Sequence, residues 1–178
     1  LLDNIGLITV RQVAEKDFSH AYMTENIVEC RITLSNKGYG YLFPLYLYPN
    51  TNKKDLFSEH DSGEKKPNIK PELFEELKAS FKKEVTPEKI FYYIYAILYS
   101  NTYRKKYEEF LKIDFPRIPF TKDYKLLIQL GKLGNQLADL HLLKSKELDK
   151  TISKFPKDGT NKVEKPKYEN EKVWINKE

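Results

Sequence analysis

The sequence predicts an α+β fold with an N-terminal antiparallel β-meander, a helical part that contains a long leucine-rich helix, and a C-terminal β-hairpin. Apolar and polar residues alternate in short segments over residues 1–48, as half-buried strands require. Over residues 71–143, apolar residues instead recur at helical spacing. The 178 residues are 40% hydrophobic, which is enough for one buried core, and no change of composition separates two comparable halves. We therefore expect a single domain over residues 1–178.

Four segments of the first part are expected to be strands: residues 5–12, 19–24, 27–34 and 39–48. Short polar turns separate them, so neighbouring strands should be antiparallel. Cys30 lies in the third segment and is expected to fill a strand position. The fourth segment contains Pro44, which has no N–H to donate to a sheet and therefore predicts a sheet edge or a bulge.

Residues 49–70 are polar and show no period, which is typical of a mobile loop. A helix is then expected from Pro71 to about Glu84, and its apolar face is formed by Leu73, Phe74, Leu77 and Phe81. Thr86 is expected to cap the next helix. Pro87 suits the first helical position, because an N–H there would have no partner within the helix.

The segment from Thr86 to Phe120 has the densest aromatic content of the chain. Isoleucine and leucine recur on one face of its first helix, and tyrosine and phenylalanine widen the apolar surface, so this helix should be packed on several sides. Residues 100–102 interrupt the period, and a second helix is expected from Tyr103 to Leu111. Pro116 and Pro119 then enforce extended chain.

A long helix is expected from a cap at Thr121 to about Leu143. Leucines repeat along it at alternating spacings of four and three residues, which predicts a packed seam of coiled-coil type; they are Leu126, Leu130, Leu133, Leu137 and Leu140. Small residues beside the seam, Gly131, Gly134 and Ala138, permit the close approach of another backbone. Residues 144–178 form a polar tail with a hairpin, whose arms at residues 162–165 and 172–176 turn near residues 169–170.

The sequence offers no catalytic constellation. It lacks a glycine-rich dinucleotide motif, a phosphate-binding loop and the Asn-Pro-Pro-Tyr motif of amino-methyltransferases, so we expect no catalytic residue and no cofactor-binding residue. His20, His60 and His141 lack companions at metal-ligand spacing, so no metal site is expected. His141 is expected to be a packing residue.

The ends and the apolar content indicate a fragment of a larger cytoplasmic protein that does not enter a membrane. The chain begins with Leu rather than Met and contains neither a signal peptide nor a membrane span. Its single cysteine excludes an internal disulfide and fits a reducing compartment.

The net charge of +5 and the pI near 9.0 favour an anionic partner such as double-stranded DNA. Arginine reads guanine, and asparagine or glutamine reads adenine, whereas lysine mostly neutralises phosphate. The candidate DNA-binding residues are Arg11, Gln12, Asn36, Lys37, Arg104, Lys105 and Lys106. The last three are expected to clamp phosphate, and Arg117 is expected to be structural, paired with Asp114. In the alternative interpretation the lysines form only a solvated coat, and Arg11 is a solvated strand end.

The residues also carry a resemblance to a known family. The central segment FYYIYAILYSNTYRKKYEEFLKIDFPRIPF resembles the C-terminal specificity domain of type ISP restriction-modification enzymes. Further matching pieces lie in the same order along the chain: Ile5-Gly6-Leu7, Arg11-Gln12, His20-Ala21, Ser35-Asn36-Lys37, residues 43–48, Leu130-Gly131, Leu133-Gly134, residues 140–143, residues 161–165 and residues 175–177.

The resemblance implies a target-recognition domain that binds double-stranded DNA and adjoins an upstream methyltransferase domain in the same chain. It implies that the parent chain is an adenine-N6 DNA methyltransferase with translocase and endonuclease activity. The parent chain would use S-adenosylmethionine, ATP and Mg as cofactors, and this fragment would use no cofactor. The alternative is a non-catalytic interaction or scaffolding domain that docks neighbouring domains through its leucine seam.

Overall fold

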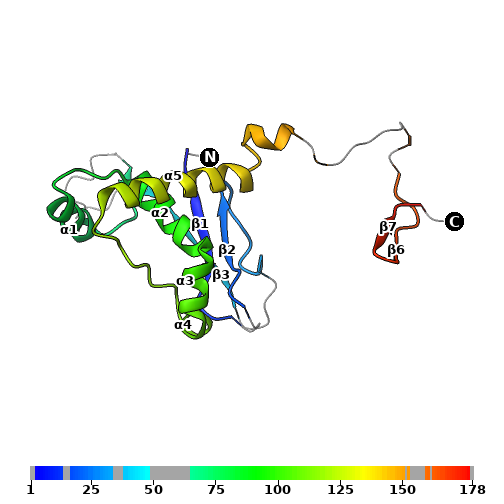
Figure 1. Ribbon diagram of the computed structural model, residues 1–178, viewed down its shortest axis with the longest axis horizontal. Helices are drawn as coiled ribbons and strands as arrows, with labels where there is room; N and C mark the ends of the chain where they lie inside the picture. Colours follow the sequence, from blue (N-terminus) through cyan, green and yellow to red (C-terminus); the bar gives the residue numbers. More distant parts are fainter. Residues whose placement is uncertain are drawn as a thin grey trace, which may run out of the picture. The chain divides into compact units, whose positions relative to one another are not determined.

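The computed structural model describes residues 3–13, 17–33, 38–48, 65–150, 152, 159–160 and 162–176. The chain divides into two compact units, Leu1–Leu148 and Asp149–Glu178 (Figure 1). The assignment of one domain to the whole chain stays a prediction. None of the helices in these described ranges is long and apolar enough to cross a membrane.

An antiparallel sheet opens the first unit. Strand β1 (Gly6–Val10) is central and pairs with β2 (Ala21–Thr24) on one side and with β3 (Gly40–Pro44) on the other. All five residues of β1 are buried, because a strand lies on each side of it and side chains cover it. Strand β3 is at the edge and ends at Pro44, which confirms the expectation for this proline.

One of the four expected strands is absent. Residues 27–33 form coil and turn, Ile27 is 82% exposed, and Cys30 is exposed rather than held in a strand. A turn begins this segment, since the backbone N–H of Asn26 donates to Oγ1 of Thr24 at 3.0 Å. The carbonyl of Cys30 accepts from the N–H of Gly40 at 2.7 Å. The bond to the Thr24 hydroxyl is a local side-chain hydrogen bond, and such bonds compete with strand pairing.

A second, two-stranded sheet follows. Strand β4 (Tyr46–Leu47) pairs antiparallel with β5 (Lys66–Pro67), so the end of the expected loop is a strand. The greater part of that loop, residues 49–64, lies outside the described residues. The hydroxyl of Tyr46 donates to the carboxylate of Glu88, which ties this sheet to the start of the helical part.

The helical part begins with α1 (Pro71–Phe81) and α2 (Pro87–Tyr99). Oγ1 of Thr86 accepts from the N–H of Lys89 at 3.4 Å, which confirms the predicted cap. The expected second helix is divided into α3 (Asn101–Lys106) and α4 (Glu108–Ile113). Ser100 separates α2 from α3, and its hydroxyl accepts from the N–H of Tyr103 at 3.3 Å.

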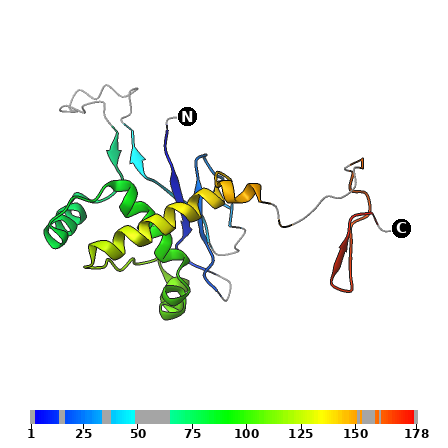
Figure 2. The same ribbon diagram turned by 45° about the horizontal axis from the view of Figure 1, so that its top comes forward.

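Helix α5 (Tyr124–His141) packs against α2 and crosses it at an angle (Figure 2), and a short 3-10 helix, η1 (Lys146–Asp149), follows it. Asp123, rather than Thr121, is its cap, because Oδ1 of Asp123 accepts from the N–H of Lys125 at 2.8 Å. Thr121 instead accepts from the N–H of Asp123 at 3.0 Å. The side chain nearest the free N–H groups at the start of the helix therefore provides the cap.

The packed face of α5 agrees with the expected leucine seam only in part, because Leu130 and Leu137 pack against the core but are not the most buried residues of the helix. Its buried residues are Leu127, Gly131, Gly134 and Ala138. A Cβ at Gly134 would lie 1.9 Å from the carbonyl oxygen of Tyr92, so the two helix backbones touch there. Leu126 and Leu133 are 42% and 57% exposed. Close backbone contact turns the small residues inward and leaves these two leucines at the surface.

Two apolar clusters form the core. The first joins the sheet to α2, α3, α4 and α5 through residues such as Leu7, Tyr95 and Leu111. The second joins α1 to the first halves of α2 and α5 through residues such as Phe81 and Leu127. The α+β class and the order of strands, helices and terminal hairpin are thus as the sequence predicts.

The second unit contains a β-hairpin. Strands β6 (Lys167–Glu169) and β7 (Lys172–Trp174) are antiparallel. Asn170 and Glu171 join them with φ angles of 52° and 60°, as a two-residue type I′ turn requires. The hairpin and its turn confirm the prediction, although the first arm lies at residues 167–169 rather than 162–165. Asn176 side-chain hydrogen bonds hold residues 162–165 nearby.

Candidate nucleic-acid interface

Arg11 and Gln12 leave the sheet at the end of its central strand. The next residue, Val13, is buried, and its N–H donates to the carbonyl of Lys112 at 3.1 Å. This contact places the end of β1 against α4. Both polar side chains are exposed on backbone that is anchored on either side, by a buried strand before them and by Val13 after them.

Arg11 forms an ion pair that the sequence does not reveal. Its Nε donates to Oδ1 of Asp114 at 3.1 Å, across 103 residues of chain. The Arg11 side chain remains 61% exposed. Among the residues that the structure describes, Nη1 and Nη2 of Arg11 have no hydrogen-bond partner. The guanidinium is therefore bound through Nε and presents its two Nη amino groups to the solvent.

The position of Asp114 is set by its neighbours. Asp114 ends α4, where its N–H donates to the carbonyl of Phe110 at 3.2 Å. Phe115 lies edge-on to Tyr41 and to Phe43 of β3, with ring centroids 5.0 and 5.7 Å apart. The N–H of Phe115 and then the Arg11 guanidinium lower the pKa of Asp114, so its carboxylate is charged at neutral pH.

A small pocket adjoins Arg11. It encloses about 210 Å³ and is lined by Arg11, Gln12, Gly38, Tyr39 and Tyr41. Tyr39 is 57% exposed, and Tyr41 is partly exposed. A guanidinium, a carboxamide and two tyrosine rings thus lie at one end of the sheet. These groups can hydrogen-bond to base edges and stack against flat rings.

A larger apolar groove lies beside Asp114. It encloses about 540 Å³, and its lining combines aromatic residues of α3 and α4 with the extended chain that follows: Tyr103, Tyr107, Phe110, Leu111, Ile113, Asp114, Phe115, Pro116, Arg117, Ile118 and Pro119. Asp114 lines this groove while its partner Arg11 lines the smaller pocket. The ion pair therefore marks the boundary between a polar recess and an apolar one.

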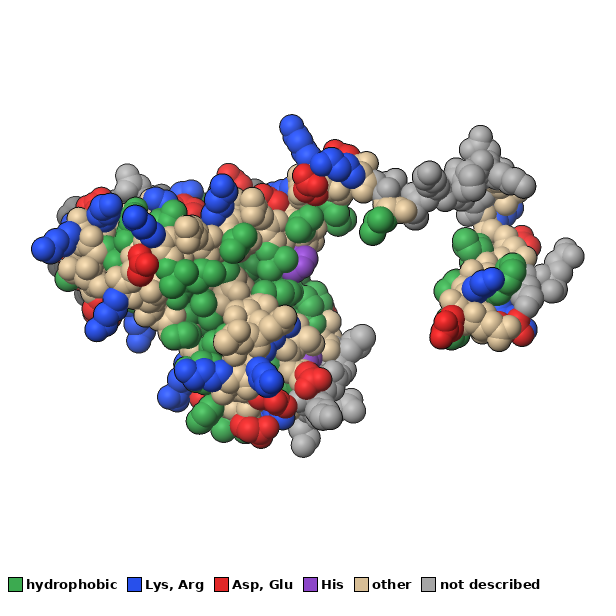
Figure 3. All heavy atoms as spheres, in the orientation of Figure 1, with side chains coloured by type: hydrophobic (Ala, Val, Ile, Leu, Met, Phe, Trp, Pro, Cys, Tyr) green, Lys and Arg blue, Asp and Glu red, His purple; other side chains and the backbone are tan. Residues whose placement is uncertain are grey.

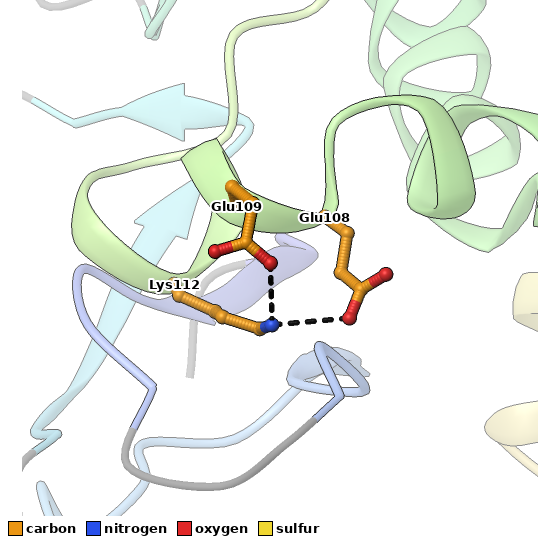
Figure 4. Close-up of polar contacts among 3 residues, drawn as sticks. All are labelled: Glu108, Glu109 and Lys112. Atoms are coloured by element: carbon orange, nitrogen blue, oxygen red, sulfur yellow. Dashed lines mark hydrogen bonds and ion pairs between the residues drawn. The ribbon is translucent and has the colours of Figure 1, made fainter.

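Acidic and basic side chains are mixed on α4. Nζ of Lys112 lies 3.0 Å from Oε1 of Glu108 and 2.9 Å from Oε1 of Glu109 (Figure 4). Two carboxylates thus neutralise Lys112, and Figure 3 shows both kinds of charge over α3 and α4. Lys112 is therefore a poorer candidate for phosphate binding than a basic group without an acidic neighbour.

Arg104 is directed into the protein rather than toward a ligand. Its Nε donates to the carbonyl of Leu98 at 2.6 Å, and its guanidinium lies over the rings of Tyr99 and Phe18, at 4.6 and 5.8 Å. The Leu98 carbonyl belongs to the last turn of α2, where carbonyls lack helical partners. This position differs from the expected phosphate clamp, because the guanidinium caps the end of α2. Lys105 and Lys106 are exposed, and their role in phosphate binding stays a prediction.

Asn36, Lys37 and Arg117 are the remaining residues that the sequence singled out. Asn36 and Lys37 lie outside the described residues. Arg117 is exposed. Together with the N–H of Phe115 and the Arg11 guanidinium, its charge lowers the pKa of Asp114, but the direct side-chain hydrogen bond to that carboxylate comes from Arg11. Sequence reasoning missed Asp114, Tyr39 and Tyr41 as neighbours of Arg11. The polar pair directly after a buried strand was the local signal, but the partner is more than a hundred residues distant.

The histidines and acids do not assemble a metal centre in the described part of the chain, where no group of three or more His, Cys, Asp or Glu residues could hold an ion. Nδ1 of His141 lies 2.6 Å from the hydroxyl of Tyr95, and its ring packs against Tyr99. His141 is therefore a packing residue, as the sequence predicts.

The fold and this surface together define a small α+β module in which an antiparallel sheet packs on a helix pair and displays arginine, glutamine and tyrosine at one end. The model of the type ISP C-terminal specificity domain matches residues 2–178. The chain therefore belongs to this family of specificity domains. No match was found among curated proteins.

Two solved structures are similar to the chain. One is the DrdV–DNA complex determined by cryo-electron microscopy, with 26% sequence identity, a TM-score of 0.59 and coverage of 78% of this chain and 12% of that one. The other is a nuclease-deletion mutant of the type ISP restriction-modification enzyme LlaGI in complex with a DNA substrate mimic, with 25% identity, a TM-score of 0.52 and coverage of 79% of this chain and 10% of that one. The chain thus spans about a tenth of the length of these relatives.

Proposed function

We propose that this domain recognises a specific sequence of double-stranded DNA for a larger restriction-modification enzyme, and that Arg11 and Gln12 read bases. The observation that carries the proposal is the cluster at the end of β1, where Arg11, Gln12 and two exposed tyrosines share one pocket. Base edges are read by side chains of these types, held on a rigid scaffold. Membership of the specificity-domain family supports this interpretation.

The parent chain, in this proposal, carries adenine-N6 methyltransferase, translocase and endonuclease activity upstream of this domain. S-adenosylmethionine, ATP and Mg bind there, and this domain binds none of them. In support, the sequence has no glycine-rich or phosphate-binding loop. Calorimetry with the isolated chain tests this division of labour, and saturable micromolar binding of S-adenosylmethionine or ATP contradicts it.

A domain exchange tests sequence recognition directly. Residues 2–178 of the intact parent are replaced by the corresponding domain of a relative with another target, and both enzymes select from randomised duplexes. We expect the selected sequence to follow the exchanged domain. If the selected sequence stays with the rest of the parent, the proposed function is wrong.

Single substitutions in the parent distinguish base recognition from phosphate binding. Arg11→Ala is expected to relax the preference at one position of the target, because one bidentate base contact contributes about 1–3 kcal/mol of discrimination. Lys105→Ala is expected to weaken all sequences alike, since an ammonium meets any phosphate nearly equally well. Methylation competition between the cognate duplex and its single-base variants measures both effects.

A second function is favoured by one observation. Leu126 and Leu133 of α5 are exposed, and Figure 3 shows apolar side chains gathered on the face that carries α5. In this alternative the domain docks a neighbouring domain through these leucines. Leu133→Glu in the parent would then lower methylation of every duplex without changing sequence preference, whereas an unchanged rate leaves recognition as the function.

A further inference from the structure

We propose that Asp114 positions the Arg11 guanidinium so that its two Nη groups contact a guanine of the recognition sequence. This inference rests on the proposed function, and it adds a positioning residue and the identity of one base. Asp114 touches no DNA in this arrangement and acts through Arg11.

The geometry of the pair supplies the first argument. The Asp114 carboxylate accepts from Nε at 3.1 Å, and Nε is the guanidinium nitrogen nearest the aliphatic part of the side chain. The outer edge, formed by Nη1 and Nη2, then points away from the carboxylate, because the guanidinium is planar and its N–H groups have fixed directions. Among the described residues these two groups have no partner, and the side chain is mostly exposed. A ligand can reach both at once.

The second argument is that Asp114 is itself immobilised. Its backbone continues the hydrogen bonding of α4, and the ring of Phe115 packs edge-on against both Tyr41 and Phe43. The N–H of Phe115 and the guanidinium also lower the pKa of the Asp114 carboxyl, so the acceptor is a carboxylate at neutral pH. A long, flexible arginine is thereby restricted before DNA arrives, which lowers the entropic cost of forming the contact.

The chemistry of the base edges identifies guanine. Its major-groove edge offers two acceptors, O6 and N7, which match two parallel N–H donors. Adenine presents one acceptor beside a donor, cytosine presents a donor, and thymine presents one acceptor beside a methyl group. Two donors from one guanidinium therefore satisfy guanine and leave an unfavourable contact on every other base.

The contrasting interpretation is an ordinary surface ion pair that binds no base. Exposed pairs of this kind contribute little to stability, and an arginine can also take two oxygens of a phosphate. A phosphate contact is independent of sequence, whereas a guanine contact depends on N7 at one position. The experiment uses this difference.

The test uses the intact parent enzyme and its cognate duplex. Each guanine of the target is replaced in turn by 7-deazaguanine, which lacks the N7 acceptor. Methylation competition against the unmodified duplex then measures the loss of methylation caused by each replacement. For the unsubstituted enzyme we expect one guanine at which methylation falls measurably, by less than the about 5- to 150-fold that a whole bidentate contact contributes, because 7-deazaguanine keeps O6. Arg11→Ala should abolish the loss at that guanine and leave the losses at other guanines unchanged.

Asp114→Ala should reduce the loss at the same guanine to a value between those of the unsubstituted enzyme and Arg11→Ala. The double variant should equal Arg11→Ala, since Asp114 has no role without Arg11. Glu109→Ala is the matched control, because it removes one exposed carboxylate from the same helix region and changes the net charge equally. It should leave the loss at that guanine unchanged.

The outcomes separate this inference from the proposed function. If Asp114→Ala behaves as Glu109→Ala does while Arg11→Ala relaxes one position, Asp114 does not position Arg11. If no 7-deazaguanine effect disappears in Arg11→Ala, the guanine contact is wrong and Arg11 binds phosphate or serves the fold. In both cases the domain exchange still decides whether the domain recognises sequence.

Discussion

The hydroxyl of Tyr95 and Nδ1 of His141 lie 2.6 Å apart where α2 meets α5. Burial raises the pKa of Tyr95 far above its usual value, so the hydroxyl stays protonated and donates a hydrogen bond to Nδ1. Partial burial beside the tyrosine rings lowers the pKa of His141, so at neutral pH the imidazole is mostly neutral and Nδ1 accepts. The protonated hydroxyl of Tyr95 and the neutral imidazole of His141 are the donor and the acceptor that this hydrogen bond requires.

This hydrogen bond predicts a pH dependence of stability. The pKa of His141 is lower in the folded chain than in the unfolded chain, where it is about 6.5, so its contribution is complete above that pH and is lost as pH falls through the folded pKa. We expect the free energy of unfolding to decrease from pH 7.5 to pH 5 more in the unsubstituted chain than in His141→Gln. Urea unfolding over this range measures the difference, and parallel profiles contradict the assignment.

At the scale of elements, the contact between α2 and α5 depends on small residues. Gly131 and Gly134 face the backbone of α2, at Lys89 and Tyr92 respectively. Glycine lowers helix propensity by about 1 kcal/mol relative to alanine. The close approach of the two helices explains why this helix contains two glycines nonetheless, since a Cβ at Gly134 would overlap a carbonyl oxygen that cannot move without the helix.

Gly134→Ala is therefore expected to destabilise the chain, although alanine favours helix. Overpacking costs about 1–3 kcal/mol and exceeds the gain in propensity, because the clashing atom is backbone. Gly131→Ala should cost less, since its Cβ would lie 3.1 Å from a carbonyl oxygen. Gly159→Ala is the control, with nothing within 4 Å. Thermal or urea unfolding should rank the three, and equal stability of Gly134→Ala and Gly159→Ala would show that the helices separate easily.

The two faces of α5 should respond differently to substitution. Leu127 is fully buried, so Leu127→Ala should cost about 2–5 kcal/mol of unfolding free energy. Leu133→Glu places a charge at an exposed position and should change stability by only about 0.5 kcal/mol. The sequence-based expectation for Leu133 was the reverse. A large loss of stability in Leu133→Glu would restore the leucine seam as the packed face.

At the scale of the whole molecule, the excess of positive charge predicts weak, salt-dependent binding of DNA by the isolated chain. The net charge is +5, and neutralisation of phosphate releases counterions. If about four to six phosphates are contacted, log K should fall against log salt with a slope of about −0.9 per contact. Fluorescence anisotropy from about 50 to 200 mM salt measures the slope. An affinity independent of salt, or none at low salt, would favour the docking function.

Features that depend only on neighbouring residues can be predicted from the sequence. The hydrogen-bonding capacity or backbone freedom of a few adjacent residues accounts for three such features. These are the Thr86 cap with Pro87, the edge position of Pro44 and the turn of the terminal hairpin. The α+β class follows from the change of apolar period near residue 71. The family resemblance rested on the order of short motifs along the chain.

The faces and side chains that meet across the fold could not be predicted in the same way, because they depend on how distant elements pack. A leucine period shows that a helix is amphipathic, but backbone contact at Gly134 selects the small residues as the inner face of α5. The end of α2 needs a donor, and this turns Arg104 inward. Arg11 and Asp114 are far apart in the chain and meet because Val13 docks on α4 and Phe115 docks on β3. Contacts between distant segments depend on how whole elements pack, and no local pattern encodes them.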